Sequence, residues 1–105
     1  MNISSAVARS RKIRKLYHQL ELSHHGSEWT IEEDALAFLT DAGLVGRLTM
    51  AQQGRWPKEE ETAPQLEHKL AECIWWLFVL AGRMNIDVER ELEAFLKKTE
   101  ANLKG

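Results

Sequence analysis

Residues 70–81 read Leu-Ala-Glu-Cys-Ile-Trp-Trp-Leu-Phe-Val-Leu-Ala, and this stretch decides the fold. From Cys73 onward its nine residues are all apolar, with no proline or glycine among them. A membrane span needs about 20 apolar residues, so the stretch is too short to cross a bilayer. Its flanks have helical composition, and a helix without a polar face packs on nearly every side. We therefore expect a buried central helix over about residues 65–84.

Glu72 is the one acid within this stretch. A carboxylate beside so much apolar surface must be paired, hydrogen-bonded, metal-bound or at the rim of the core, because an isolated buried charge is costly. The functional question is which of these applies.

Composition describes an ordinary soluble domain. The chain has 105 residues, which suits a single helical domain over 1–105. Hydrophobic residues make up 44% and charged residues 29%, which excludes a disordered chain. The formal net charge of −2 argues against a general nucleic-acid binder.

Cysteine content and the first residues indicate a cytoplasmic protein. The single cysteine, Cys73, cannot form an intramolecular disulfide, and its place in the apolar run favours a buried thiol in a reducing compartment. No apolar stretch follows a basic start near Met1, so we expect neither a signal peptide nor a membrane partner.

Apolar spacing and capping signals predict four helices and no strand, which is an all-α four-helix bundle. Ser4 or Ser5 can cap the first helix, and Thr30 with Glu33 forms a capping box before the second. Asp87 is a natural N-cap for the last helix. The expected helices cover about residues 5–23, 31–52, 65–84 and 88–103.

The second helix has a predicted inward face and one unusual residue. Gly43 lies mid-helix, where glycine costs about 1 kcal/mol against alanine, so we expect another helix or a ligand to approach closely there. The positions expected to face inward are Leu36, Leu39, Ala42, Val45 and Leu48.

Three polar segments have more than one interpretation. Five basic residues near the start form either a solvated surface or one that contacts phosphate or a partner; they are Arg9, Arg11, Lys12, Arg14 and Lys15. Adjacent His24 and His25 favour a loop over a metal site, because neighbouring loop residues rarely chelate one ion alone. The charged linker 54–64 contains Trp56, which either caps the bundle edge or stacks on a ligand base.

Two acids lie on otherwise inward-looking helical surface, Asp41 on the second helix and Glu72 on the third. Helices joined by one linker tend to pack antiparallel, which brings these two midpoints together. Facing carboxylates repel each other and persist if a cation lies between them or if one holds a proton. An oxygen-only pair suits Mg²⁺, although a salt-bridged structural pair has the same sequence pattern.

Three segments resemble the MazG-like branch of the all-α nucleoside triphosphate pyrophosphohydrolases. They are Trp29–Glu33 continuing through Asp41-Ala42-Gly43, then Leu70–Trp75, then Asn85-Ile86-Asp87, and the resemblance covers about residues 13–103. It implies an α-helical bundle completed by a homodimer or higher oligomer. It also implies Mg²⁺-dependent hydrolysis of a nucleoside triphosphate to the monophosphate and pyrophosphate.

The resemblance also assigns a metal site, with two substitutions. The family's Glu-x-x-Glu falls on Asp41 and Leu44, and its Glu-x-x-Asp falls on Lys69 and Glu72. Asp41 and Glu72 are then the catalytic and metal-binding acids, and Lys69 with Trp56 the substrate-binding residues. Four carboxylates hold two divalent ions in such sites. Two carboxylates beside a lysine carry less negative charge, and therefore attract a divalent ion more weakly.

Lys69 lies three residues before Glu72, so both can share a helical face. Either its ammonium forms a metal-free ion network with Asp41 and Glu72, or it extends to solvent and a weak single-ion site survives.

Three functions follow from this pattern. The first is a (d)NTP pyrophosphohydrolase with weakened or lost activity, which makes the enzymatic status of the chain uncertain. The second is a non-catalytic nucleotide- or protein-binding bundle. The third is a structural dimerisation module, because the apolar third helix and Trp75-Trp76 exceed what a bundle of this size easily buries.

Overall fold

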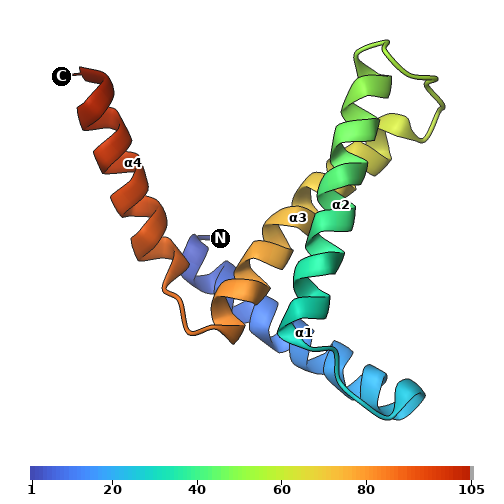
Figure 1. Cartoon of the computed structure of the whole chain (residues 1–105), viewed down its shortest axis with the longest axis vertical. Helices are drawn as coiled ribbons and strands as arrows, with labels where there is room; N and C mark the ends of the chain where they lie inside the picture. Colours follow the sequence, from blue (N-terminus) through green and yellow to red (C-terminus); the bar gives the residue numbers. More distant parts are fainter. Residues whose placement is uncertain (105) are drawn as a thin grey trace.

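The computed structural model describes residues 1–104, and within that range the chain forms four helices and no strand (Figure 1). The helices are α1 (Ile3–His25), α2 (Ile31–Gln52), α3 (Thr62–Arg83) and α4 (Val88–Lys104). The predicted all-α class and the number of helices are confirmed.

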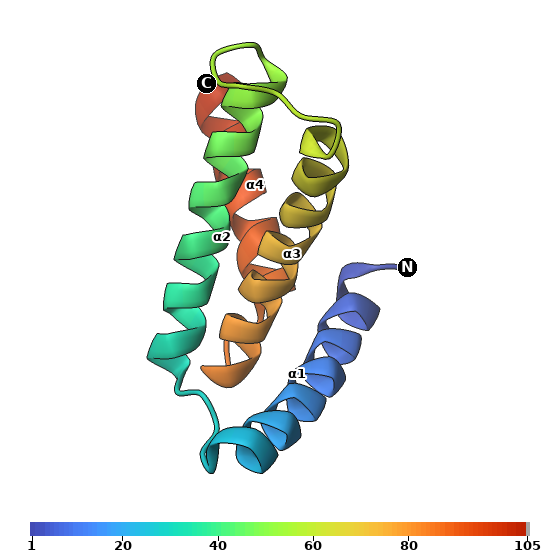
Figure 2. The same cartoon turned by 90° about the vertical axis from the view of Figure 1, so that its right-hand side faces the viewer.

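Helices α1, α2 and α3 form the packed part of the molecule. Figure 2 shows α2 and α3 side by side, running in opposite directions, with α1 against α3. The apolar residues with the least exposed surface lie on α2 and α3, and they are Ala51, Trp76, Val79 and Ala81. This is a small core, so much of the interior of the three-helix unit is filled by polar side chains.

Helix α4 diverges from the other three helices, as Figure 1 shows, and none of its residues is buried. The Cα radius of gyration is 16.7 Å, against about 13 Å for a compact chain of this length. The four helices therefore do not close into one compact bundle within the single chain, and completion of the bundle by a second chain stays a prediction. The break lies at Asn85, whose φ of 58° is left-handed, just after the end of α3.

Capping determines most of the helix boundaries. At the start of α2, the Thr30 hydroxyl accepts from the Glu33 N–H and the Glu33 carboxylate accepts from the Thr30 N–H, which confirms the predicted capping box. Asp87 accepts from the N–H of Arg90 and begins α4 as predicted. In α1 the N-cap is Asn2, and Ser5 is the reciprocal partner rather than the cap.

Helix α3 begins at Thr62, before the predicted start near residue 65. Pro64 lies in its first turn, where the missing N–H has no helical partner to lose. The Thr62 hydroxyl accepts from the N–H of Glu59, which fixes the end of the linker against the helix.

The apolar faces are not all buried. Leu36 and Leu39 of α2 were expected inward but are 62% and 65% exposed. Helix α3 also leaves Leu70, Ile74 and Leu77 exposed, so the predicted packing on nearly every side is not reached within the single chain. The most buried positions of α2 are Asp34, Asp41 and Ala51.

None of the four helices in residues 1–104 combines the length and apolarity that crossing a membrane requires.

Candidate functional site

Lys69 lies between the two predicted acids. Its Nζ donates to Asp41 Oδ1 at 3.0 Å and to Glu72 Oε1 at 2.9 Å. The antiparallel packing of α2 and α3 brings these three side chains together, as the sequence predicts. Trp76 completes the group, because its Nε1 donates to Asp41 Oδ2 at 3.0 Å. Both oxygens of Asp41 are therefore occupied by donors of α3.

This Asp41–Lys69–Glu72 network stabilises a charged lysine. Hydrogen bonds to Glu72 and to Asp41 raise the pKa of Lys69 above its usual value, against an opposing effect of burial. The Lys69 side chain is 26% exposed, so its ammonium does not extend freely into solvent. Of the two interpretations of Lys69, the ion network is the one that the structure contains.

The donor set at this network does not fit Mg²⁺. The dication prefers near-octahedral oxygen coordination, and the two carboxylates present already accept from an ammonium or an indole N–H. Leu44, which the sequence resemblance aligns with an acid, supplies no oxygen. Across residues 1–104 no cluster of three or more His, Cys, Asp or Glu side chains is arranged to hold a metal.

Trp56 lies outside the network and contacts Arg47. It is half exposed, and the Arg47 guanidinium lies 3.8 Å from the centre of its ring. Arg47 in turn lines a cleft of about 460 Å³ together with Leu44, His68 and Lys69. Trp56 is thus held by a cation–π contact with Arg47, and it makes no hydrogen bond to Asp41 or Glu72.

An aromatic pocket opens on another side of Glu72. Its volume is about 320 Å³, and its aromatic walls are Tyr17, Trp29, Trp75 and Trp76. Tyr17 meets Trp75 edge-on, with ring centres 5.9 Å apart. Flat rings of this kind suit a flat, partly apolar ligand, and Glu72 supplies an acceptor at the edge of the pocket.

A second ion network, which the sequence analysis missed, ties three helices together. Asp34 of α2 has no exposed surface. It accepts from Arg14 of α1 through Nε at 3.2 Å and Nη2 at 2.7 Å, and from Arg83 Nη1 of α3 at 2.9 Å. Asp34 lies seven residues before Asp41, so both share one helical face, and that spacing is the signal that points to it.

Glu21 extends this network to the end of α1. It accepts from Arg14 Nη1 at 2.8 Å and from the Trp29 N–H at 2.8 Å, and His18 Nδ1 lies 3.1 Å away. Burial opposes ionisation of Glu21, but the hydrogen bonds from Arg14 and Trp29 outweigh it and lower its pKa.

The remaining candidates show no catalytic arrangement. Burial, and then the charges of Asp41 and Glu72, raise the pKa of the half-buried Cys73 thiol, which disfavours a reactive thiolate. His24 and His25 lie in the last turn of α1 rather than in a loop, and Gly26 ends that helix with a φ of 77°. Their ring centres are 6.5 Å apart, and the planes of the two rings are tilted by 60°.

Comparison of this chain with family models, with curated proteins and with solved structures gives no match.

Proposed function

We propose that this chain is a MazG-like nucleotide pyrophosphohydrolase bundle whose hydrolysis of a (d)NTP to (d)NMP and pyrophosphate is weakened or lost. The observation that supports the loss is the position of Lys69 Nζ, 3.0 Å from Asp41 and 2.9 Å from Glu72. A nucleotide remains the proposed ligand because the aromatic pocket lies directly beside Glu72.

The electrostatics explain the weakened step. Two carboxylates and one ammonium leave a net charge of about −1 in the network, whereas four carboxylates attract two dications. A divalent ion that enters must displace a lysine whose charged form both acids already stabilise. Lys69 and Trp56 are the residues that we propose contact the substrate, with Lys69 as a point charge for a phosphate oxygen.

Restoring the family's acids tests this proposal. The double variant Leu44→Glu with Lys69→Glu should gain Mg²⁺ affinity, measured by calorimetry with and without a non-hydrolysable triphosphate. The wild type should give little or no pyrophosphate from common and deoxy triphosphates in Mg²⁺ or Mn²⁺. A variant with Thr49→Glu and Lys58→Glu makes the same change in net charge at exposed positions, and it should gain nothing.

Two results would contradict the proposal. Rapid metal-dependent turnover by the wild type would show that Lys69 does not weaken the site. A double variant that folds but binds Mg²⁺ no better than the wild type would show that Asp41 and Glu72 are not the remains of a metal site.

We further propose that the chain assembles as a homodimer. Helix α4 carries an exposed apolar stripe, made of Leu92, Phe95, Leu96 and Leu103. The same chain exposes Leu36 and Leu39 on α2 and Ile74 on α3. In a dimer with two-fold symmetry, the α4 stripe of each chain packs against the exposed residues of α2 and α3 of the other chain. Both apolar surfaces are then buried.

Sedimentation equilibrium at micromolar concentration tests the assembly. The expected mass is twice the 12.1 kDa of one chain. A mass equal to one chain would refute it.

A further inference from the structure

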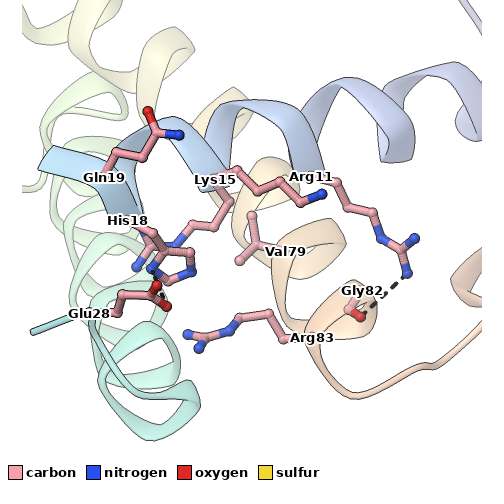
Figure 3. A pocket seen from close by; sticks show the side chains of 9 residues that line it. Arg11, Lys15, His18, Gln19, Glu28, Val79, Gly82 and Arg83 are labelled. Carbon is pink, nitrogen blue, oxygen red and sulfur yellow. Dashed lines mark hydrogen bonds and ion pairs between the residues drawn. The ribbon is translucent and has the colours of Figure 1, made fainter. Parts of the chain in front are cut away.

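A cleft of about 560 Å³ lies between α1 and the C-terminal end of α3 (Figure 3). Arg11, Lys15 and His18 line it from α1, Arg83 lines it from α3, and Val79 lies between the two sides. Arg83 is fourteen residues from Lys69 on the same helix, a separation of about 21 Å. The cleft is therefore distinct from the Asp41–Lys69–Glu72 network.

Two of the cations in the cleft are held in place. Arg83 uses Nη1 for Asp34 at 2.9 Å and for the carbonyl oxygen of Trp29 at 3.0 Å, so its Nε and Nη2 stay available. Arg11 Nη2 reaches the Gly82 carbonyl oxygen at 3.5 Å, as Figure 3 shows. Gly82 permits this approach, because a Cβ there would lie 3.2 Å from Arg11 Nε.

The charges of the cleft are not balanced by its own acids. Within residues 1–104, no carboxylate lies within ion-pair distance of Lys15 or Arg11. Glu28 is the one acid in the lining, and it lies 3.6 Å from His18 Nδ1. Asp34 and Glu21, behind the cleft, are already bonded to arginines. Counting these three acids against Arg11, Arg14, Lys15 and Arg83, the region has one more cation than acid.

We propose that this cleft binds a small phosphate-bearing anion. Arg83 is pre-oriented by Asp34 and offers two N–H directions, which suits the oxygens of a phosphate group. Lys15 adds a point charge from the opposite side, and Arg11 adds a third cation along the cleft. The volume lies within the 300–1,000 Å³ that is usual for small-ligand sites, so a phosphate ester with a small organic group over Val79 fits.

Inorganic pyrophosphate is the probe that tests the cleft, titrated calorimetrically into the full chain at low salt. Lys15→Ala should weaken its binding at least tenfold, because it removes an unpaired cation. Lys12→Ala removes an equal charge from an exposed position of α1 outside the cleft lining, and it should change binding less than twofold. Gly82→Ala should also weaken binding, because it displaces Arg11.

Lys69→Ala separates this site from the proposed nucleotide site. Pyrophosphate binding that survives Lys69→Ala and is lost in Lys15→Ala belongs to the cleft, whatever the outcome at the network. Vesicles with phosphatidic acid headgroups form a parallel arm. Lys15-dependent binding to vesicles alone would keep the phosphate site and identify a lipid headgroup as its source. Absence of binding in both arms, or binding that Lys15→Ala leaves unchanged, would overturn the proposal.

Discussion

Asp34 is a fully buried carboxylate that accepts hydrogen bonds from arginines of two other helices. Such a residue contributes little net stability as an ion pair, yet its removal is costly, because it leaves Arg83 without a carboxylate partner and Arg14 with Glu21 alone. The interior of the packed unit therefore depends on this charge as much as on its few buried apolar side chains.

Replacing Asp34 with asparagine keeps the shape of the side chain and removes its charge. We expect Asp34→Asn to lower the free energy of unfolding by about 3 kcal/mol, since the buried Arg14 and the partly buried Arg83 each lose a charged partner. Urea unfolding followed by tryptophan fluorescence measures the loss. Glu32→Gln, an exposed acid-to-amide change in the same helix, should cost less than about 0.5 kcal/mol. Equal costs for the two variants would contradict the role given to Asp34.

Glu21 makes the stability depend on acid pH. Its pKa is lower in the folded chain than its usual value of 4.5, so the unfolded chain binds the proton more readily. The stability from this group is present above pH 4.5 and is lost as the pH falls through the folded pKa. Unfolding free energies at pH 6 and pH 3 should differ less in Glu21→Gln than in the wild type. An identical difference in both proteins would show that Glu21 does not contribute.

At the scale of the helices, local signals predicted more than burial patterns did. The limits of α2 follow from the Thr30–Glu33 capping box, which is a local arrangement and is legible in sequence. The predicted start of α3, near residue 65, is too late because the predicted linker 54–64 includes Pro64, although the first turn of a helix accepts proline. Leu36 and Leu39 were placed inward because apolar residues mark a core face, whereas this face has no partner within the chain.

The site was predictable in part for the same reason. Asp41, Lys69 and Glu72 meet because an antiparallel pair of helices and an i to i+3 spacing are both readable from sequence. The ion network of Asp34 is not predictable in this way, because its partners, Arg14 and Arg83, come from two helices that are distant in the sequence. A charged residue looks like solvated surface in sequence until its partners are placed.

Gly43 gives a test at this scale. A glycine in mid-helix was expected to mark a close approach, but within the single chain nothing lies within 4 Å of where its Cβ would be. Gly43→Ala should therefore stabilise the chain by about 1 kcal/mol, through higher helix propensity. Thermal unfolding monitored by circular dichroism detects the gain. Destabilisation that grows with protein concentration would instead place a second copy against this glycine.

At the scale of the whole molecule, α4 is the element that the proposed homodimer requires. Phe95→Glu places a charge in the middle of its apolar stripe, where Phe95 is 63% exposed in one chain. We expect this variant to sediment as a monomer and to keep the helical content of the wild type, because no residue of α4 is buried in the single chain. Ala101→Glu adds the same charge to another face of α4 and should leave the dimer intact. Dissociation by both variants, or by neither, would contradict an interface on the Phe95 stripe.

Asn85 lies where the chain leaves the packed helices and turns into α4, so a change in its backbone angles moves the whole of α4. The backbone reverses there through a single left-handed residue, and beyond it the 17 residues of α4 extend about 25 Å. A rotation of about 20° at Asn85 moves the far end of α4 by about 9 Å. The direction in which α4 presents its exposed apolar stripe thus depends on a residue outside the packed core, so a sequence change at Asn85 can redirect α4 without disturbing either ion network.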